Sequence, residues 1–261
     1  MAVVKEIIIY PIKGLKGISL QESEVEVMGL KDDRRLMLVD EEGLFISQRT
    51  HPELLKFDLE YKDGHIAVAF GDDRIELLDK GNNHEIRVQI WDHEVKAKTL
   101  DASADTWFSK HLNKGVKLVL IPHSKARIKS FLKEPGQSPV SFADGYPILV
   151  LGTSSLEDLN NRLESSVGMN RFRGNIILET SDPFEEDTYD NFQIGTTQLM
   201  TVKPCARCQV ITIDPETGIQ GKEPLKTLST YRRDGNKVNF GSNVITKITG
   251  RIRVGDKVNH L

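Results

Sequence analysis

The sequence is poor in cysteine, with only Cys205 and Cys208 among its 261 residues. Two thiols three positions apart cannot form a framework of disulfides. They also cannot supply the four thiolates that an iron–sulfur cluster usually requires. We therefore expect no iron–sulfur cluster in this chain, and we predict a reducing compartment, by default the cytoplasm.

Long apolar runs and an excess of charge of one sign are also missing. No hydrophobic stretch approaches the roughly 20 residues that cross a bilayer, so we expect no membrane partner. The first nine residues read as a strand rather than as a signal peptide. The formal net charge of −3 argues against a general nucleic-acid-binding protein, although it leaves room for a local basic pocket.

Many short segments alternate apolar and polar residues, which predicts a mainly β protein with a few helices (α+β). The strands expected in the first half cover residues 3–12, 18–27, 36–40, 44–48, 57–61, 65–70, 74–78, 85–91 and 94–99. Further strands are expected at 116–121, 146–151, 175–179, 198–202, 209–213, 239–240, 244–248 and 251–254.

Helical periodicity is predicted in three places. One helix covers 103–112, a second is capped by Ser154 or Ser155 and runs to Leu163, and a third covers 224–233. Residues 123–142 contain two prolines and several basic and small residues, and we interpret them as a loop or linker. Trp91 and Trp107 are expected in the core. The acidic run 182–190 is expected to be a solvated loop, with a docking patch for a redox partner as the alternative.

Both cysteines lie in the run Lys203-Pro204-Cys205-Ala206-Arg207-Cys208, between two predicted strands. A thiolate is a soft metal ligand or a nucleophile, and an adjacent arginine favours the thiolate form and offers a fork of N–H donors to an anion. This combination suggests a metal carried by an anionic cofactor. Half of a zinc site is an alternative, and Cys205 taken alone reads as a small buried residue.

Basic residues also recur at turns and strand ends, beside glycine, proline or cysteine. They include Lys13, Arg34, Arg49, Arg173 and Arg207. Each one alone reads as a solvated surface charge. Together, with the backbone N–H groups that such turns expose, they indicate a site for a phosphate-bearing ligand.

These motifs resemble the MOSC (molybdenum cofactor sulfurase C-terminal) superfamily. Tyr10-Pro11-Ile12-Lys13-Gly14, residues 29–40 and residues 46–52 are similar to its N-terminal β-barrel domain. Residues 142–147, Phe172-Arg173-Gly174-Asn175 and the cysteine run are similar to the MOSC domain itself. The similarity covers nearly the whole chain, in order, and is nearest to the amidoxime-reducing branch of the family. It implies a β-barrel-like domain over 1–122 and a β-barrel MOSC domain over 123–261.

The resemblance implies a molybdenum–molybdopterin cofactor in a cleft between the two domains. Cys208 matches the thiolate that binds molybdenum, and Asp144 matches an acidic residue near the metal, so both are candidate catalytic residues. Lys13, Arg34 and Arg173 match residues that hold the phosphate and pterin. The other cofactor-binding candidates are Gly14, Arg49, Gly145, Tyr146, Asn175, Ala206 and Arg207. We expect Arg207 to favour the thiolate form of Cys208.

The activity implied by the resemblance is reduction of small N-hydroxylated compounds by oxygen-atom transfer to molybdenum. Electrons would come from an external protein such as a ferredoxin, a flavodoxin or a cytochrome b5-like donor. Gly145-Tyr146 departs from the family, because related reductases often have small hydroxyl residues there. The alternative is a non-catalytic carrier of sulfur or of the cofactor that uses Cys208. A third interpretation is a basic cleft for another anion, such as pyridoxal phosphate.

Overall fold

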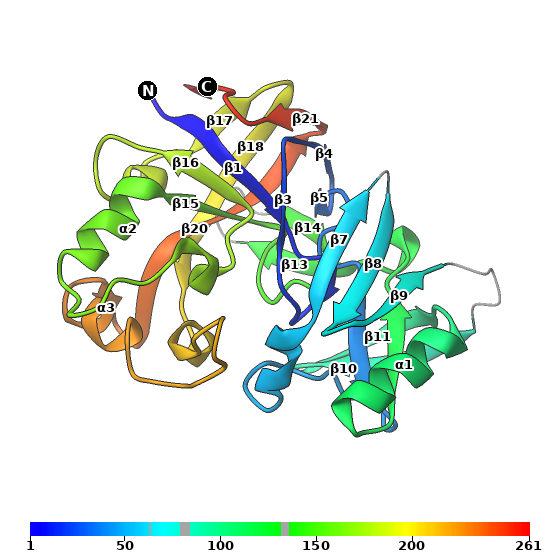
Figure 1. Cartoon of the computed structure of the whole chain (residues 1–261). Helices are drawn as coiled ribbons and strands as arrows, with labels where there is room; N and C mark the ends of the chain where they lie inside the picture. Colours follow the sequence, from blue (N-terminus) through cyan, green and yellow to red (C-terminus); the bar gives the residue numbers. More distant parts are fainter. Residues whose placement is uncertain (63, 79–83, 132–135) are drawn as a thin grey trace.

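The computed structural model describes residues 1–62, 64–78, 84–131 and 136–261. This part of the chain is mainly β, with three α-helices, so the predicted fold class is confirmed. Figure 1 shows a larger and a smaller lobe side by side, with both chain ends on the larger lobe. Over the described residues, none of the helices has the length and apolar character needed to cross a membrane.

The larger lobe is built on a nine-stranded sheet, which we call the large sheet, with the order β22-β17-β18-β20-β15-β16-β1-β3 and β19 paired to β20. Its strands are β1 (Val3–Ile9), β3 (Ile18–Leu20), β15 (Ile148–Gly152), β16 (Ile176–Glu179), β17 (Asn191–Ile194), β18 (Thr197–Ala206), β19 (Arg233–Asp234), β20 (Lys237–Ile248) and β22 (Val258–His260). Among the described strand pairs of the large sheet, β15 and β16 are the one parallel pair. Because β1 pairs with β16, the start of the chain belongs to a sheet made mostly by its second half.

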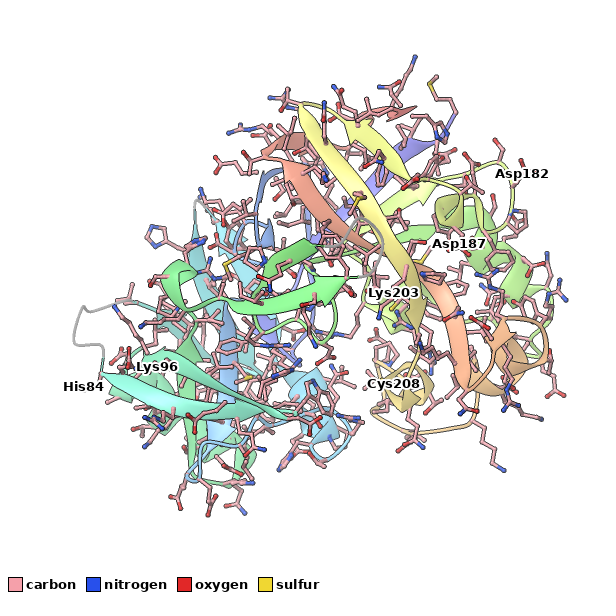
Figure 2. All side chains as sticks on the ribbon, turned by 180° about the vertical axis from the view of Figure 1, so that it is seen from behind. His84, Lys96, Asp182, Asp187, Lys203 and Cys208 are labelled. Carbon is pink, nitrogen blue, oxygen red and sulfur yellow. The ribbon has the colours of Figure 1, made fainter. Side chains whose placement is uncertain are left out.

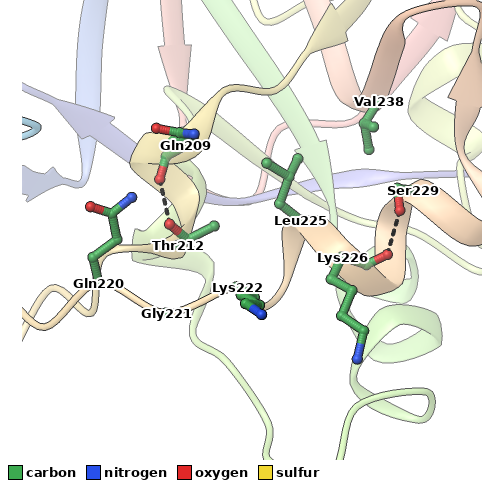
Figure 3. A pocket seen from close by; sticks show the side chains of 9 residues that line it. All are labelled: Gln209, Thr212, Gln220, Gly221, Lys222, Leu225, Lys226, Ser229 and Val238. Carbon is green, nitrogen blue, oxygen red and sulfur yellow. Dashed lines mark hydrogen bonds between the residues drawn. The ribbon is translucent and has the colours of Figure 1, made fainter.

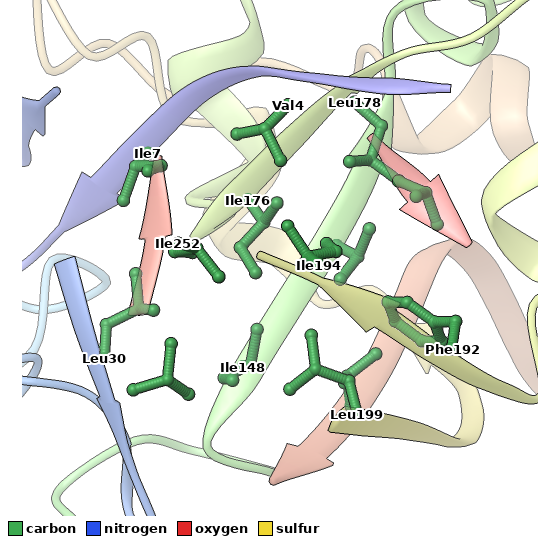
Figure 4. Close-up of a cluster of buried hydrophobic side chains, with 14 of the residues drawn as sticks. Val4, Ile7, Leu30, Ile148, Ile176, Leu178, Phe192, Ile194, Leu199 and Ile252 are labelled. Carbon is green, nitrogen blue, oxygen red and sulfur yellow. The ribbon is translucent and has the colours of Figure 1, made fainter. Parts of the chain in front are cut away.

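Branched aliphatic side chains from several of these strands fill the core of the larger lobe. Figure 4 shows Ile7, Ile148, Ile176 and Phe192 meeting there, and all four are fully buried. The helices α2 (Thr153–Asn160) and α3 (Leu225–Tyr231) belong to the same lobe. The strand patterns alternate or run continuously apolar as expected for a sheet packed on a core.

The smaller lobe combines a five-stranded sheet of order β10-β11-β12-β6-β2 with a three-stranded sheet of order β7-β8-β9. Its strands are β2 (Ile12–Lys13), β6 (Leu36–Asp40), β7 (Asp58–Lys62), β8 (His65–Phe70), β9 (Asp73–Leu77), β10 (Glu85–Ile90), β11 (His93–Thr99) and β12 (Val116–Leu120). Helix α1 (Ala102–Leu112) packs against it with Phe108 and Trp107 in the core. Asp101 caps α1 by accepting a hydrogen bond from the Ser103 N–H, which satisfies one of the free donors at the helix start.

Two smaller pairings complete the strands. One is a three-stranded sheet of β21 (Gly250–Arg253), β4 (Glu22–Glu26) and β5 (Gly29–Leu30). The other is a hairpin of β13 (Arg127–Phe131) and β14 (Gly136–Val140). The short 3₁₀ helices are η1 (Pro52–Lys56), η2 (His123–Lys125), η3 (Met169–Phe172), η4 (Glu185–Asp187) and η5 (Gln209–Thr212).

The β13–β14 hairpin shows that the loop predicted for residues 123–142 was wrong for the described part of that range. Pro139 lies opposite Ile128 inside the hairpin. A two-stranded hairpin has two free edges, so a proline can point its missing N–H away from the partner strand. Pro135 lies outside the described residues.

Other predicted elements differ as well. Residues 209–212 form the 3₁₀ helix η5 rather than a strand, and 44–48 contributes only isolated bridges. The Ser155 hydroxyl does not cap α2, because it donates to Glu186 Oε2 at 2.7 Å, and Ser154 bonds the Thr180 carbonyl. The acidic run is not simply a solvated loop, since Glu186 is fully buried. The short strands β17 and β22 went unpredicted.

Candidate functional site

Lys13 and Asp144 meet where the smaller lobe touches the segment that leads into β15. The buried Lys13 ammonium donates to the Phe142 carbonyl at 2.9 Å and to Asp144 Oδ1. The Phe142 N–H in turn donates to the Arg34 carbonyl at 3.0 Å, which fixes this segment. Desolvation opposes ionisation of Asp144, but Lys13, the Trp91 N–H and Arg34 outweigh it and hold the pKa of Asp144 below its usual range. Asp144 is therefore a stable anion whose side chain remains 63% exposed.

Arg34 and Arg173 lie against one ring, that of Tyr10. The guanidinium carbons of Arg34 and Arg173 are 4.6 and 4.2 Å from the Tyr10 ring centroid. Arg34 also donates to Asp33 Oδ2 at 2.6 Å and to the Arg173 carbonyl at 3.1 Å. Burial, with a further contribution from Arg34, lowers the pKa of Arg173 to about 10. Tyr10 belongs to the Tyr-Pro-Ile-Lys motif, yet only its lysine and the following glycine were predicted as site residues.

Asn175 accepts a hydrogen bond from Arg34 and fixes its orientation. Its side-chain oxygen accepts from Arg34 Nη1 and from the Leu149 N–H, both at 3.1 Å, and its Nδ2 donates to the Ile8 carbonyl. The residue is 1% exposed. The Asn175 amide therefore orients Arg34 and links β1 to β15. It thereby supports the pair Arg34 and Arg173, which we call the basic cluster.

The cysteine run lies at the end of β18, immediately before η5. Figure 2 shows Cys208 on the side of the larger lobe that faces the smaller one, and Cys208 is exposed while Cys205 is half-buried. Arg207 Nη1 donates to Cys205 Sγ at 3.2 Å, and its Nη2 donates to the Phe172 carbonyl at 2.7 Å. The Arg207 guanidinium thus contacts Cys205, and the effect of Arg207 on Cys208 stays a prediction.

A small cavity of about 20 Å³ lies between the two lobes. It is lined by Gln48 and Leu55 from the smaller lobe and by Arg173, Val210 and Ile213 from the larger lobe, among others. Arg173 thus lies beside η5, the helix that Cys208 precedes. Arg173 and Val210, which are far apart in the sequence, both line this cavity. Arg173 belongs to the basic cluster, and Val210 follows the cysteine run.

A larger groove of about 410 Å³ lies on the other side of η5, between that helix and α3. Figure 3 shows the apolar Leu225 and Val238 and the basic Lys222 and Lys226 among the side chains that line it. Gln209, directly after Cys208, also lines it. A strand predicted at 209–213 has no place for this groove, which depends on the 3₁₀ helix η5.

Arg127 is a buried cation that the sequence interpretation missed. It is 8% exposed, and its Nη1 donates to the Ala143 carbonyl at 3.0 Å. Its Nε and Nη2 are buried and have no hydrogen-bond partner among the residues that the structure describes. The sequence interpretation assigned residues 123–142 to a loop or linker. The strand β13, which begins with the buried Arg127, was therefore not predicted.

The remaining predicted residues surround these groups. Gly14 has φ +89°, where a side chain would be strained, and its carbonyl accepts from Gln48 Nε2 at 2.6 Å. The Tyr146 hydroxyl donates to the Ser130 carbonyl at 3.1 Å. Ala206, the last residue of β18, pairs with Asn239. Gly145 follows Asp144, and a side chain in its place would reach Asn243.

Trp91 is not a core residue, contrary to the prediction, whereas Trp107 is. Trp91 is 36% exposed, and its Nε1 donates to Asp144 Oδ1 at 2.9 Å. The predicted site residue Arg49 stacks on its ring, with the guanidinium carbon 4.2 Å from the centroid. A tryptophan in a turn gave no signal of this role in the sequence.

The donor set fits an anionic group. Four buried or half-buried cations (Lys13, Arg34, Arg127 and Arg173) face two carboxylates, Asp33 and Asp144. The positive charges also destabilise one another, since Arg34 and Arg127 both contribute to the lowered pKa of Lys13, after burial. Over the ranges described, no group of three or more histidine, cysteine, aspartate or glutamate side chains could hold a metal ion by itself. An anion bound here would relieve the excess positive charge and pair the free N–H groups of Arg127.

Comparison with known proteins gives consistent matches along the chain. The family model of the MOSC N-terminal beta barrel domain matches residues 1–115, and that of the MOSC domain matches residues 137–259. The chain is 32% identical over 277 residues to the mitochondrial amidoxime-reducing component 1 of Mus musculus, covering 98% of this chain and 81% of that protein. It is 33% identical over 270 residues to the mitochondrial amidoxime reducing component 2 of Macaca fascicularis, covering 96% and 81%.

Solved structures resemble the chain more distantly. The YUAD protein of Bacillus subtilis has a TM-score of 0.42 at 8% identity, covering 99% of this chain and 94% of that one. YiiM from Geobacillus stearothermophilus has a TM-score of 0.36 at 14% identity, covering 69% and 72%. The division of the chain at residue 122 stays a prediction.

Proposed function

The chain belongs to the MOSC family, and from this premise we propose that it is an oxidoreductase that reduces small N-hydroxylated compounds. The proposal rests on the relatives' name, amidoxime reducing components, and on the chemistry of the cleft. The observation that carries it is the excess of buried positive charge, of which one member, Arg173, lines a cavity together with Val210 of η5, the helix that the exposed Cys208 precedes. A fold alone would not decide the reaction, since one fold supports many activities.

A molybdopterin-type molybdenum cofactor would supply two-electron oxygen-atom transfer when bound in this cleft. Lys13, Arg34 and Arg173 would hold its phosphate and pterin, and Arg127 adds unpaired N–H donors to that set. Cys208 would be the protein's ligand to the metal, a soft thiolate suited to a metal already bound by sulfur. The half-buried Cys205 is engaged by Arg207, which leaves Cys208 as the exposed thiol of the pair.

Asp144 is the residue placed to handle protons. Reduction of an N-hydroxylated compound breaks the N–O bond, consumes two electrons and two protons, and releases the amine or amidine with water. Asp144 is ionised and solvent-exposed, and Lys13 and Trp91 fix one of its oxygens. Among the described residues no group donates to the second oxygen, which can therefore accept a hydrogen bond from water and orient it.

An external redox protein would supply the two electrons. The chain has only two cysteines, too few for a four-thiolate cluster of its own. The proposed donor is a ferredoxin, a flavodoxin or a cytochrome b5-like protein. A screen of these three types for electron transfer to the chain would identify the one that serves. The relatives are mitochondrial by name, and a cytoplasmic location stays a prediction for this chain.

The test is expression of the same chain in two matched hosts, one that makes the molybdenum cofactor and one that cannot. We expect molybdenum in the protein from the first host only, and reduction of benzamidoxime to benzamidine by that preparation with an artificial electron donor. A folded protein that contains no molybdenum from either host contradicts the proposal. Molybdenum without reduction, together with a persulfide on Cys208 in the mass spectrum, favours a carrier of sulfur or cofactor instead.

A further inference from the structure

Trp91 occupies a strained position at the tip of the β10–β11 hairpin. Ile90 pairs with His93, so Trp91 and Asp92 form a two-residue turn. Trp91 has φ +54°, in the left-handed region that bulky residues rarely adopt. Two-residue hairpin turns favour glycine, asparagine or aspartate at such positions. A backbone conformation of this kind persists only where the surroundings hold it, which directs attention to what the indole contacts.

The edge of the indole reaches Asp144. Its Nε1 donates at 2.9 Å to Oδ1, the same oxygen that Lys13 contacts. The Trp91 carbonyl accepts from Gln89 Nε2 at 3.1 Å, which fastens the turn to its own strand. The hairpin tip of the smaller lobe is therefore tied to the acidic residue of the proposed site.

The faces of the indole carry two further groups. Arg49 lies over the ring, with 4.2 Å between its guanidinium carbon and the ring centroid, and Phe45 packs at 4.7 Å between centroids. Arg49 is exposed and makes no hydrogen bond to the described residues. Stacking restricts the guanidinium without using its N–H donors, so these remain available to a bound anion.

We propose that Trp91 is a positioning residue of the reductase site, with its edge fixing the orientation of Asp144 and its face holding Arg49 over the cleft. The proposal rests on the proposed function. It differs from a purely structural role because, although Phe45 belongs to a hydrophobic cluster, the indole's other two contacts end on the exposed charged residues Asp144 and Arg49. The hairpin tip thereby sets the relative placement of an acid and a cation that come from different parts of the chain.

Two substitutions separate the two contacts. Trp91→Phe removes the N–H and keeps an aromatic face, so only Asp144 is released. Trp91→Leu removes both contacts. We expect Trp91→Phe to lower kcat for benzamidoxime about tenfold with little change in KM, because a hydrogen bond to a charged group is lost. Trp91→Leu should lower kcat as much and also raise KM. Trp107→Phe, in the core beneath α1, is the matched control and should leave both constants near the wild-type values.

A second measurement needs neither substrate nor cofactor. Trp107→Phe leaves Trp91 as the only tryptophan, so its fluorescence reports the contacts directly. In this background Asp144→Ala should shift the emission maximum, and Arg49→Ala should raise the acrylamide quenching constant. If Trp107→Phe does not fold, the emission of Trp91 is obtained as the difference between the spectra with and without Trp91→Phe. This difference is measured in the wild type, in Asp144→Ala and in Arg49→Ala.

The outcomes are distinguishable. Unchanged emission and quenching in both variants would show that the contacts do not form in solution, and would overturn the inference whatever the activity. Wild-type kcat in Trp91→Phe would overturn the positioning role while leaving the reductase standing. Responsive fluorescence in a protein that never reduces benzamidoxime would remove the role together with the proposed function.

Discussion

Cys205 and Cys208 have different surroundings although they lie three positions apart. Cys205 is half-buried and receives the Arg207 guanidinium at 3.2 Å, whereas Cys208 is exposed at the start of η5. The half-buried Cys205 thiol therefore has a structural contact with Arg207. An exposed thiol beside a cationic cleft is the one free to take a ligand.

This difference predicts opposite results for two matched substitutions. Cys208→Ser should remove most of the bound molybdenum, because a serine hydroxyl is a poor ligand for a soft metal site. Cys205→Ser should keep most of the metal and lose about 1 kcal/mol of stability through its contact with Arg207. Molybdenum per chain, measured by elemental analysis, checks the pair. Equal metal in the two variants would remove Cys208 from the site.

Tyr10 is the residue on which the basic cluster rests. Both Arg34 and Arg173 stack on its ring, and its hydroxyl donates to the Gly174 carbonyl at 3.3 Å. Tyr10→Phe keeps the ring and should cost about 1 kcal/mol. Tyr10→Leu loses two cation–π contacts and should cost about 3 kcal/mol, with faster loss of molybdenum on dialysis. Urea unfolding and metal retention measure the two effects, and equal behaviour of the variants would show that the ring face is unimportant.

At the scale of elements, the β13–β14 hairpin contributes a cation to the cleft at a cost to stability. Arg127 is buried, and two of its nitrogens, Nε and Nη2, have no hydrogen-bond partner within the described part of the chain. An unpaired buried cation destabilises a folded chain unless a ligand compensates it. This is the signature of a residue retained for binding.

Arg127→Met is therefore expected to be neutral or stabilising by about 1–2 kcal/mol in the protein without cofactor, while weakening cofactor retention. Urea unfolding of protein from the cofactor-deficient host measures the first effect. Molybdenum per chain measures the second. Lys117→Met, which removes an exposed charge on β12, is the control and should change neither. A large loss of stability in Arg127→Met would show that the arginine is structural.

The η4 segment contains a buried carboxyl with a pH-dependent effect. Glu186 is 1% exposed, its Oε2 accepts from Ser155, and its Oε1 has no hydrogen-bond partner in the described ranges. Burial raises the pKa of Glu186 above its ordinary value of 4.5. The folded chain thus holds this proton more tightly than the unfolded chain, so its contribution to stability is full below pH 4.5 and is lost as pH rises through the raised pKa.

Glu186→Gln should remove this dependence. Its free energy of unfolding relative to wild type should increase between pH 4.5 and pH 8. Urea unfolding of both proteins at several pH values tests this. Parallel curves for the two proteins would show that Glu186 does not titrate as described.

The elements differ in how well the sequence predicts them. The hairpin β7–β8 and helix α1 were predicted within about one residue, because their apolar periodicity is regular. The turn residue Asp63 lies outside the described residues. The helix η5 was mistaken for a strand because four residues are too few to show a period. Trp91 and Arg127 could not be predicted as site residues, since only tertiary contacts bring them to Asp144.

At the scale of the whole molecule, the two lobes are not separable pieces of sequence. Strand β1 lies between β16 and β3 in the large sheet, and β4 pairs with β21. A chain of residues 123–261 would expose the edge of β16 and lose Ile7 and Ile9 from its core. An open, apolar strand edge promotes aggregation.

Residues 123–261 alone should therefore aggregate or fail to give a dispersed amide NMR spectrum. Co-expression with residues 1–122 as a separate chain should restore a folded complex. A monomeric, well-dispersed spectrum from 123–261 by itself would show that β1 is dispensable.

The cavity between the lobes has Arg173 in its lining and lies against η5, the helix that Cys208 precedes, so a cofactor held by both would occupy this region. The most direct measurement is an anomalous difference map, recorded at the molybdenum absorption edge, from crystals of the cofactor-loaded protein. We predict one peak per chain within bonding distance of Cys208 Sγ, on the side that faces Arg173. A peak elsewhere, or none in crystals of active protein, would contradict it.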